Sequence, residues 1–317
     1  MDTITHGLIG TLSSKTGFYQ KAGRVATIAF TVGAIFPDID IVTTFLGPEF
    51  SLRYHRGLTH SLIAAPLFAF ILALVIYRFS SYKKYWFIVA MIALGIYSHI
   101  FFDLITSYGT VIFDPLSMKR YSWNLVFILD PFITLPVILG LILCRRKREF
   151  ANRFSFGIFA YLALYLILCF YSRELNSGKV DEFAKDKSLS VVKSSVYPRP
   201  LAPLFWMGVI ETEDAFYKVN LSMFGKNPEG FERIAKTNHN QFVELAKNLE
   251  VTKLYFWFAD YPVAEYKEEG GRHVVEFYDL RFGVIPNKIP FPLRIVFDGS
   301  DSIVSISLNG RTLRGRL

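Results

Sequence analysis

The chain has 317 residues, of which 52% are hydrophobic and 16% aromatic, and its formal net charge is +8. This apolar fraction exceeds that of ordinary water-soluble domains, so the composition favours a membrane protein. The two cysteines exclude a disulfide framework and a thiolate metal cluster.

The excess positive charge lies in the first half of the sequence. Residues 1–171 carry 15 lysines and arginines against 8 acidic residues, whereas the remainder is nearly balanced. Long apolar runs fill the same half, so the basic residues are expected to act as topology signals or to meet an anionic ligand, and nucleic acid is not an expected partner. No basic region opens the N-terminal segment MDTITHGLIG, so no cleavable signal peptide is expected.

Apolar runs predict membrane-spanning helices, each of which needs about 20 residues. The weakest run, at 22–36, is broken by Pro37. The stronger candidates, in chain order, are 60–78, 85–105, 124–144 and 154–172. The segment before Lys15 is helix-like but too short to span, so it is expected to be re-entrant or a half-helix packed inside the bundle.

Clusters of lysine and arginine set the predicted orientation. The strongest cluster covers 145–153, and two others cover 78–84 and 15–24. All three fall in alternate loops, so one orientation places them all in the cytoplasm. The loops 37–59 and 106–123, and everything after Tyr171, then face outward.

A few basic residues oppose this orientation because they lie in the outward loops: Arg53, Arg56, Lys119 and Arg120. An anionic ligand would explain them, since the arginine fork suits phosphate. We therefore predict Arg53, Arg56 and Arg120 as substrate-binding residues. The alternative is a solvated loop face.

Histidines and aspartates converge on the outer side of the predicted helices. They are His6, Asp38, Asp40, His55, His60, His99, Asp103 and Asp130. Ionisable groups inside a membrane are costly and mark functional sites. His99 and Asp103 are four residues apart, which places them on one helical face, and Asp2 and His6 repeat the spacing in reverse.

Imidazole and carboxylate together suit a divalent metal, with Zn²⁺ as the first choice and Mn²⁺ or Fe as alternatives. The predicted ligands are His6, Asp38, His60, His99 and Asp103, and the choice between Asp38 and Asp40 stays open. The predicted catalytic residues are Asp40, Asp130 and His55. Asp40 or Asp130 would be an extra ligand, a general base or the partner that orients a histidine.

Each residue also has a purely structural interpretation. FPDID can end one helix and cap the next. Asp130 precedes Pro131 and can bond a freed backbone group, His6 can be an interior histidine, and His55 can lie in a solvated loop.

The segments DTITHGLIG, FPDID, HRGLTHS, SHIFFD and YGTVIFDPLSMKRYSWN occur in this order. Over about residues 1–170 the sequence resembles the YdjM-like, or LexA-binding, family of inner-membrane-associated metal-dependent hydrolases. The resemblance implies a metal-dependent hydrolase in the bacterial cytoplasmic membrane and leaves the substrate open.

A more distant similarity is to the zinc-dependent phospholipase C and single-strand nuclease group. It implies metal ligands at His6, Asp38 or Asp40, His60, His99 and Asp103. That group carries two HxxxD motifs on later helices and this chain carries one, so one or two metal ions are expected instead of three.

From about residue 176 the pattern changes to period-two alternation, which is typical of strands. The predicted strands are SVVKSSV, AFYKVNLSMF, VTKLYFWFA, HVVEFYDLRF, LRIVFDG and SIVSISL, and one amphipathic helix is predicted at 231–249. The predicted fold is an α-helical polytopic membrane domain at 1–175 with the metal site, followed by a small α+β extracytoplasmic domain at 176–317.

These features predict an integral-membrane metal-dependent hydrolase that cleaves a phosphoester or other ester of a membrane lipid at the outer face by metal-activated water. The lipid bilayer and a lipid or other anionic substrate are the expected partners, and the oligomeric state is open. One alternative is a non-hydrolytic membrane protein that binds, senses or transports metal. Another is a partner-binding protein that works through its outer domain.

Overall fold

The structure is a computed structural model that describes residues 1–226, 228, 230–237, 240–283 and 291–313. Its contacts divide the chain into two units. The helical unit comprises Met1–Asp40, Arg56–Arg173 and Pro200–Leu204, and the sheet unit comprises Ile41–His55, Glu174–Arg199 and Phe205–Leu317. Neither unit is one continuous segment.

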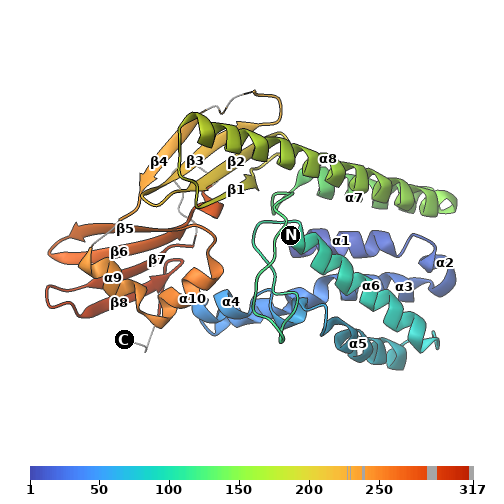
Figure 1. Ribbon diagram of the computed structural model, residues 1–317. Coiled ribbons are helices and arrows are strands. Elements are labelled where there is room, and N and C mark those ends of the chain that lie inside the picture. The colour runs from blue at the N-terminus through green and yellow to red at the C-terminus, as the bar shows by residue number, and fades with distance from the viewer. Residues whose placement is uncertain (227, 229, 238–239, 284–290, 314–317) are drawn as a thin grey trace. The chain divides into compact units, whose positions relative to one another are not determined.

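The helical unit is built from helices that pack in an apolar core. They are α1 (Thr3–Ser13), α2 (Phe18–Ala22), α3 (Arg24–Ile35), α5 (Ala65–Phe79), α6 (Tyr85–Leu104), α7 (Pro131–Arg146) and the first part of α8 (Ala151–Asp186). Short 3₁₀ segments connect them: η1 (Phe36–Phe45), η2 (Leu58–His60) and η3 (Arg148–Phe150). Figure 1 shows α1, α3, α5 and α6 side by side.

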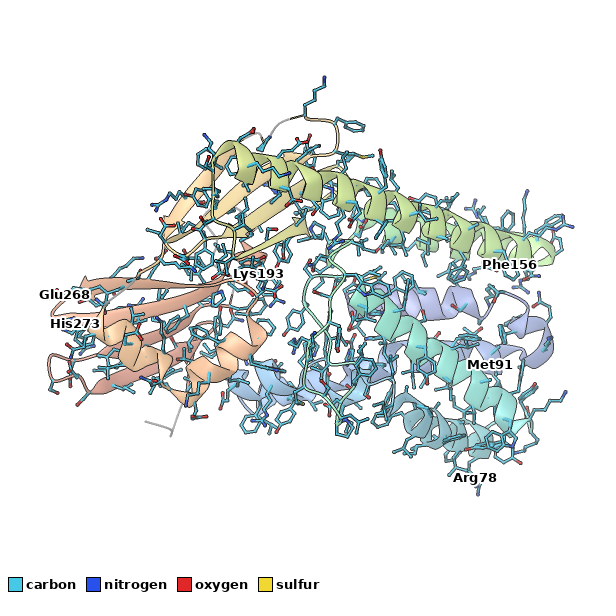
Figure 2. All side chains as sticks on the ribbon, viewed as in Figure 1. Arg78, Met91, Phe156, Lys193, Glu268 and His273 are labelled. Atoms are coloured by element: carbon cyan, nitrogen blue, oxygen red, sulfur yellow. The ribbon has the colours of Figure 1, made fainter. Side chains whose placement is uncertain are left out.

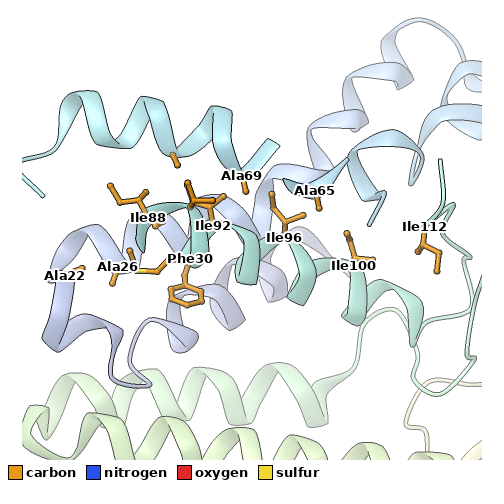
Figure 3. Packing of buried hydrophobic residues seen from close by; sticks show 14 of the residues in the cluster. Ala22, Ala26, Phe30, Ala65, Ala69, Ile88, Ile92, Ile96, Ile100 and Ile112 are labelled. Carbon is orange, nitrogen blue, oxygen red and sulfur yellow. The ribbon is translucent and has the colours of Figure 1, made fainter. Parts of the chain in front are cut away.

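The core between α5 and α6 follows a four-residue repeat on each helix. Its buried members are Ala65, Ala69 and Ala73 of α5 and Ile88, Ile92, Ile96 and Ile100 of α6 (Figure 3). Residues four apart share one helical face, and small residues on α5 let its backbone approach the isoleucines closely.

Two glycines allow α3 and α6 to approach even more closely. A Cβ atom on Gly33 would lie 2.4 Å from the carbonyl oxygen of Ile92, and one on Gly95 would lie 2.7 Å from that of Phe30. Any larger residue would push the helices apart. His99 lies one turn after Gly95, so this contact sets its distance from α3.

Among the described residues, three helices are long and apolar enough to cross a membrane: Arg24–Phe45, Tyr85–Leu104 and Arg148–Asp186. The helical segments Pro48–His60 and Ala65–Phe79 meet at a bend of 75°. If these two segments form one broken span, the number of candidate spans rises to four. The second predicted span therefore begins later than expected, because His60 belongs to η2 and the helix starts at Ala65.

The helix predicted over 124–144 also begins too early. α7 starts at Pro131 and has 16 residues. Asp130 accepts a hydrogen bond from the backbone N–H of Phe132 at 2.9 Å, and a proline in the first turn has no N–H to satisfy. These two residues fix the helix start, so residues 124–130 are outside it.

The described strands of the sheet unit form two antiparallel sheets in which neighbours in sequence are paired. The four-stranded sheet contains β1 (Lys193–Pro198), β2 (Phe205–Glu211), β3 (Ala215–Ser222) and β4 (Gly230–Ala235). The five-stranded sheet contains β5 (Pro262–Glu269), β6 (Arg272–Asp279), β7 (Leu293–Phe297), β8 (Ile303–Leu308) and β9 (Arg311–Thr312). The remaining elements are α4 (Pro48–Tyr54), α9 (Gln241–Lys247), α10 (Glu250–Phe258) and η4 (Leu280–Phe282).

Two sequence predictions in this unit are wrong. The helix predicted at 231–249 begins as strand β4, in which Ile234 pairs with Phe216 of β3, and among the described residues of this range the helical ones are those of α9. The strand predicted at 251–259 lies in α10, whose buried residues are Thr252, Tyr255 and Phe258. Their spacing of three residues forms one helical face.

Polar side chains connect β1 of the first sheet to Asp260, which precedes β5 of the second. Tyr197 of β1 donates to a carboxylate oxygen of Asp260 at 2.8 Å, and Lys193 (Figure 2) lies 3.2 Å from the other oxygen. Burial raises the pKa of Asp260, but Arg281, Lys193 and the Tyr197 hydroxyl outweigh it and hold the pKa below its ordinary value. The ionised carboxylate therefore contributes to the stability of this unit.

Candidate metal centre

Within the described residues, four side chains of the helical unit each offer one ligand atom to a common point. They are Asp38, His60, His99 and Asp103, and these atoms all lie within 4.8 Å of one another. Asp38 comes from η1, His60 from η2, and the other two from successive turns of α6. Segments far apart in the sequence thus supply one site.

Five of the six distances among these atoms are close to those of a tetrahedron. His60 Nε2 lies 3.0 Å from His99 Nε2 and 3.2 Å from Asp103 Oδ2. Asp103 Oδ2 lies 3.4 Å from His99 Nε2. Asp38 Oδ1 lies 3.7 Å from His60 Nε2 and 3.5 Å from His99 Nε2. A tetrahedral ion with bonds of about 2.0–2.1 Å separates its ligands by about 3.3 Å. The group therefore has the dimensions of a four-coordinate site.

Hydrogen bonds on the far side of each imidazole set its tautomer. His99 Nδ1 lies 2.6 Å from the carbonyl oxygen of Ala34, which can only accept, so Nδ1 carries the proton. His60 Nδ1 lies 3.2 Å from Oδ2 of Asp40. In the neutral rings both Nε2 atoms then present lone pairs to the same point, which is how metal-binding histidines are held.

The Asp103 carboxylate provides the test of whether a metal fits. Its side chain is fully buried, and within the described part of the chain its Oδ2 has no hydrogen-bond partner. A buried carboxylate oxygen without a partner is costly. A cation bound by the four atoms would satisfy it, so the donor set fits a divalent ion.

The other oxygen of Asp103 is surrounded by positive and polar groups. Oδ1 lies 2.9 Å from a terminal nitrogen of Arg56 and 3.2 Å from His6 Nε2, and it also contacts the amino group of Met1. His6 stacks on the ring of His99 with centroids 3.7 Å apart. The structure thus brings four of the five predicted ligands together and places His6 directly beside them.

Asp38 and Asp40, which the sequence left undecided, have different surroundings. Asp38 lies in the group of four, whereas Asp40 lies on the far side of His60. Asp40 also accepts from the backbone N–H of Arg56 at 2.8 Å and from the Thr59 hydroxyl at 3.0 Å. This geometry matches the role of a partner that orients a histidine.

The remaining predicted site residues lie elsewhere. Asp130 caps α7 and accepts a hydrogen bond from Tyr165 at 2.7 Å. Arg120 donates to the carbonyl oxygen of Gly109 at 2.7 Å, and Arg53 and His55 belong to the sheet unit. These positions leave the predicted catalytic role of Asp130 and His55, and the predicted substrate contacts of Arg53 and Arg120, as predictions.

Some residues at the centre have no place in the sequence prediction. Thr3 donates to Asp38 Oδ2 at 2.5 Å, and Thr59 holds Asp40. The position of Thr59 next to His60 in HRGLTHS was a usable signal. The carbonyl of Ala34 carries none, because any residue has one.

Comparisons with known proteins identify the family of the chain. The family model of the YdjM inner membrane protein matches residues 1–175. The chain is also 27% identical, over 331 aligned residues that cover 98% of it and 95% of the relative, to the Bacillus subtilis (strain 168) protein named "Uncharacterized protein YfhP". No solved structure matches. The resemblance in the sequence is confirmed: the chain belongs to the YdjM inner membrane protein family.

Proposed function

We propose that the protein is an integral-membrane metal-dependent hydrolase whose substrate is a phosphoester or other ester of a membrane lipid. One observation carries this proposal. Of the four ligand side chains, Asp38 is 12% exposed while His60, His99 and Asp103 are 0% exposed. The group therefore reaches the surface through one carboxylate, which gives water and a substrate an approach that a wholly enclosed site lacks.

A divalent ion held by Asp38, His60, His99 and Asp103 would lower the pKa of a bound water to about 7 and polarise the ester. The protein's own contribution begins at Asp38. Its Oδ2 accepts the Thr3 hydroxyl, which fixes the carboxylate at the exposed edge. From there Oδ2 can take the proton of the attacking water as a general base.

Exposed apolar residues adjacent in sequence to Asp38 and Thr3 support a lipid substrate. Ile39, next to Asp38, is 53% exposed, and Ile4, next to Thr3, is 75% exposed. Exposed isoleucines at the approach to a polar site suit a molecule with an apolar body and a polar head. The outward-facing orientation, with the sheet unit outside the cytoplasm, is part of the proposal and comes from the lysine and arginine distribution.

The test is hydrolysis of defined lipids by the purified full-length protein in detergent. Phosphatidylglycerol, phosphatidic acid and a water-soluble p-nitrophenyl phosphate ester are compared, with Zn²⁺ or Mn²⁺ added. We expect metal-dependent turnover of a lipid that is abolished in His99→Ala and retained in the matched histidine variant His273→Ala. A protein that binds metal and hydrolyses none of these esters contradicts the proposal.

A second candidate function has its own observation. Four protein side chains each offer a ligand atom, and sites whose four positions are all taken by protein ligands are typically structural, without catalysis. This favours a membrane protein that binds, senses or transports metal. Inorganic phosphate added to the Co²⁺-loaded protein separates the two, because its visible spectrum changes only where the ion accepts a further ligand.

A further inference from the structure

We propose that Arg56 is the positioning residue of the metal centre. Its side chain orients Asp103 so that one oxygen of that carboxylate serves as a ligand. Its backbone N–H holds Asp40, the aspartate that orients His60. The proposal rests on the metal centre of the proposed function and replaces the substrate contact that the sequence predicted for Arg56.

The guanidinium group engages one face of Asp103. One terminal nitrogen lies 2.9 Å from Asp103 Oδ1, and the other donates to the Thr106 hydroxyl at 3.1 Å. That hydroxyl in turn donates to the backbone carbonyl of Asp103 at 2.8 Å. The planar fork is thereby fixed on the last turn of α6, and Oδ2 is the oxygen left to face the other ligands.

The backbone of Arg56 engages the opposite side of the centre. Its N–H donates to Asp40 Oδ2 at 2.8 Å, and its carbonyl accepts from Val111 at 2.9 Å. Its φ angle is +61°, a left-handed conformation that a side-chain-bearing residue adopts at a cost. These contacts hold that conformation, which sends the N–H toward Asp40 while the side chain reaches Asp103.

The positive charge of Arg56 also sets how many ions the centre accepts. In a two-metal site a carboxylate bridges ions about 3.5–4 Å apart, one on each oxygen. Here Arg56 occupies the Oδ1 side of Asp103, with a side chain that is only 3% exposed. A second ion would have to displace a buried guanidinium, so the centre takes one ion.

The experiment uses Co²⁺ titration of the full-length protein in detergent, followed by visible absorption, for wild type, Arg56→Ala, Arg56→Lys and the control Arg78→Ala. Arg78 is an exposed arginine of the same unit, near the end of α5 (Figure 2). We expect wild type to bind one Co²⁺ with a four-coordinate spectrum. We expect Arg56→Ala to bind it 10–100-fold more weakly, as for other residues that support metal ligands, with a weaker band as Asp103 binds through both oxygens.

Arg56→Lys keeps the charge but loses the fork, so we expect a smaller loss of affinity and a spectral change in the same direction. Wild-type affinity and spectrum in Arg56→Ala overturn the proposal, as does an equal loss in Arg78→Ala. If Arg56→Ala does not fold, wild-type behaviour of Arg56→Lys overturns it. Wild type that binds no Co²⁺ overturns the metal centre and the proposed function together. If the Co²⁺ spectra are as expected but the protein hydrolyses no ester, the role of Arg56 is supported and only the proposed hydrolase activity is contradicted.

Discussion

The Nδ1 atom of His60 lies 3.2 Å from Oδ2 of Asp40. On the other side of the same ring, Nε2 lies 3.2 Å from Oδ2 of Asp103. One imidazole is therefore held between a carboxylate that orients it and a carboxylate that shares its site. Asp38, the other aspartate of FPDID, belongs to the group of four ligands, so replacing Asp38 and replacing Asp40 should affect metal binding differently.

Replacing Asp40 with Asn should weaken metal binding about 10–100-fold, because a neutral amide replaces the carboxylate that orients the ring and fixes its tautomer. Asp38→Asn should weaken binding further, since it removes a charged ligand. Zn²⁺ affinity measured by competition with a chromophoric chelator distinguishes the two. A loss in Asp40→Asn as large as that in Asp38→Asn would mean that Asp40 is itself a ligand.

Removing both histidines of the group should abolish stoichiometric metal. We expect the double variant His60→Ala/His99→Ala, purified without chelator, to contain no bound zinc, manganese or iron by inductively coupled plasma mass spectrometry. The control is His273→Ala, which removes a histidine of the sheet unit that stacks on Phe242. Metal retained at wild-type level in the double variant would disprove the site.

The close contact of α3 with α6 should be required for metal affinity as well as for stability. A Cβ atom at Gly95 would lie 2.7 Å from the carbonyl oxygen of Phe30 and 2.9 Å from the backbone nitrogen of Ala34. Gly95→Ala should therefore destabilise the protein by about 1–3 kcal/mol and move His99 away from the Ala34 carbonyl.

The measurement is Tm with and without Zn²⁺, and the shift caused by Zn²⁺ should shrink in Gly95→Ala. The control is Gly157→Ala in α8, where an added Cβ atom meets nothing within 4 Å. Alanine favours the helix there, so a small gain of stability is expected. If the increase in Tm caused by Zn²⁺ is unchanged in Gly95→Ala, the packing of α3 against α6 is not required for metal affinity.

The sheet unit should lose stability in acid through Asp260. A carboxyl group whose pKa is lower in the folded state stabilises the protein above its unfolded pKa, which is about 3.9, and that contribution disappears as the pH falls through the folded pKa. Wild type should therefore weaken progressively below about pH 4. Asp260→Asn should be less stable at pH 7 and should vary less with pH in this range.

Fluorescence of Trp206, which is fully buried in β2, follows the unfolding. Glu268→Gln makes the same charge change at an exposed position of β5 (Figure 2) and should shift the unfolding free energy by less than about 0.5 kcal/mol. Identical acid profiles for wild type and Asp260→Asn would exclude Asp260 as the acid-sensitive group.

Spacing along the chain was sufficient to pair His99 with Asp103, because i and i+4 share a face on any α-helix. It was not sufficient to choose between Asp38 and Asp40. Asp38 and Asp40 have identical side chains and lie two residues apart in FPDID, so only the backbone path of η1 decides which of them faces the histidines. The family resemblance reached the same residues and left the same choice open.

The errors in the sheet unit have one physical cause. FERIA and TKLYFWF contain apolar residues at positions that fit either a strand or a helix, and short apolar runs do not distinguish the two. Pairing with β3 makes the first a strand, and burial of Tyr255 and Phe258 makes the second a helix. Both decisions come from tertiary contacts that lie outside the segments themselves.

The ligands of the metal centre come from segments that are far apart along the chain: His60 and His99 are separated by 39 positions. An ion that joins them acts as a cross-link, so its binding free energy adds to the free energy of folding. Newly made protein that meets no metal lacks this cross-link and is therefore more open to proteolysis. The amount of this protein in a cell is therefore expected to follow the supply of metal, even where its synthesis is constant.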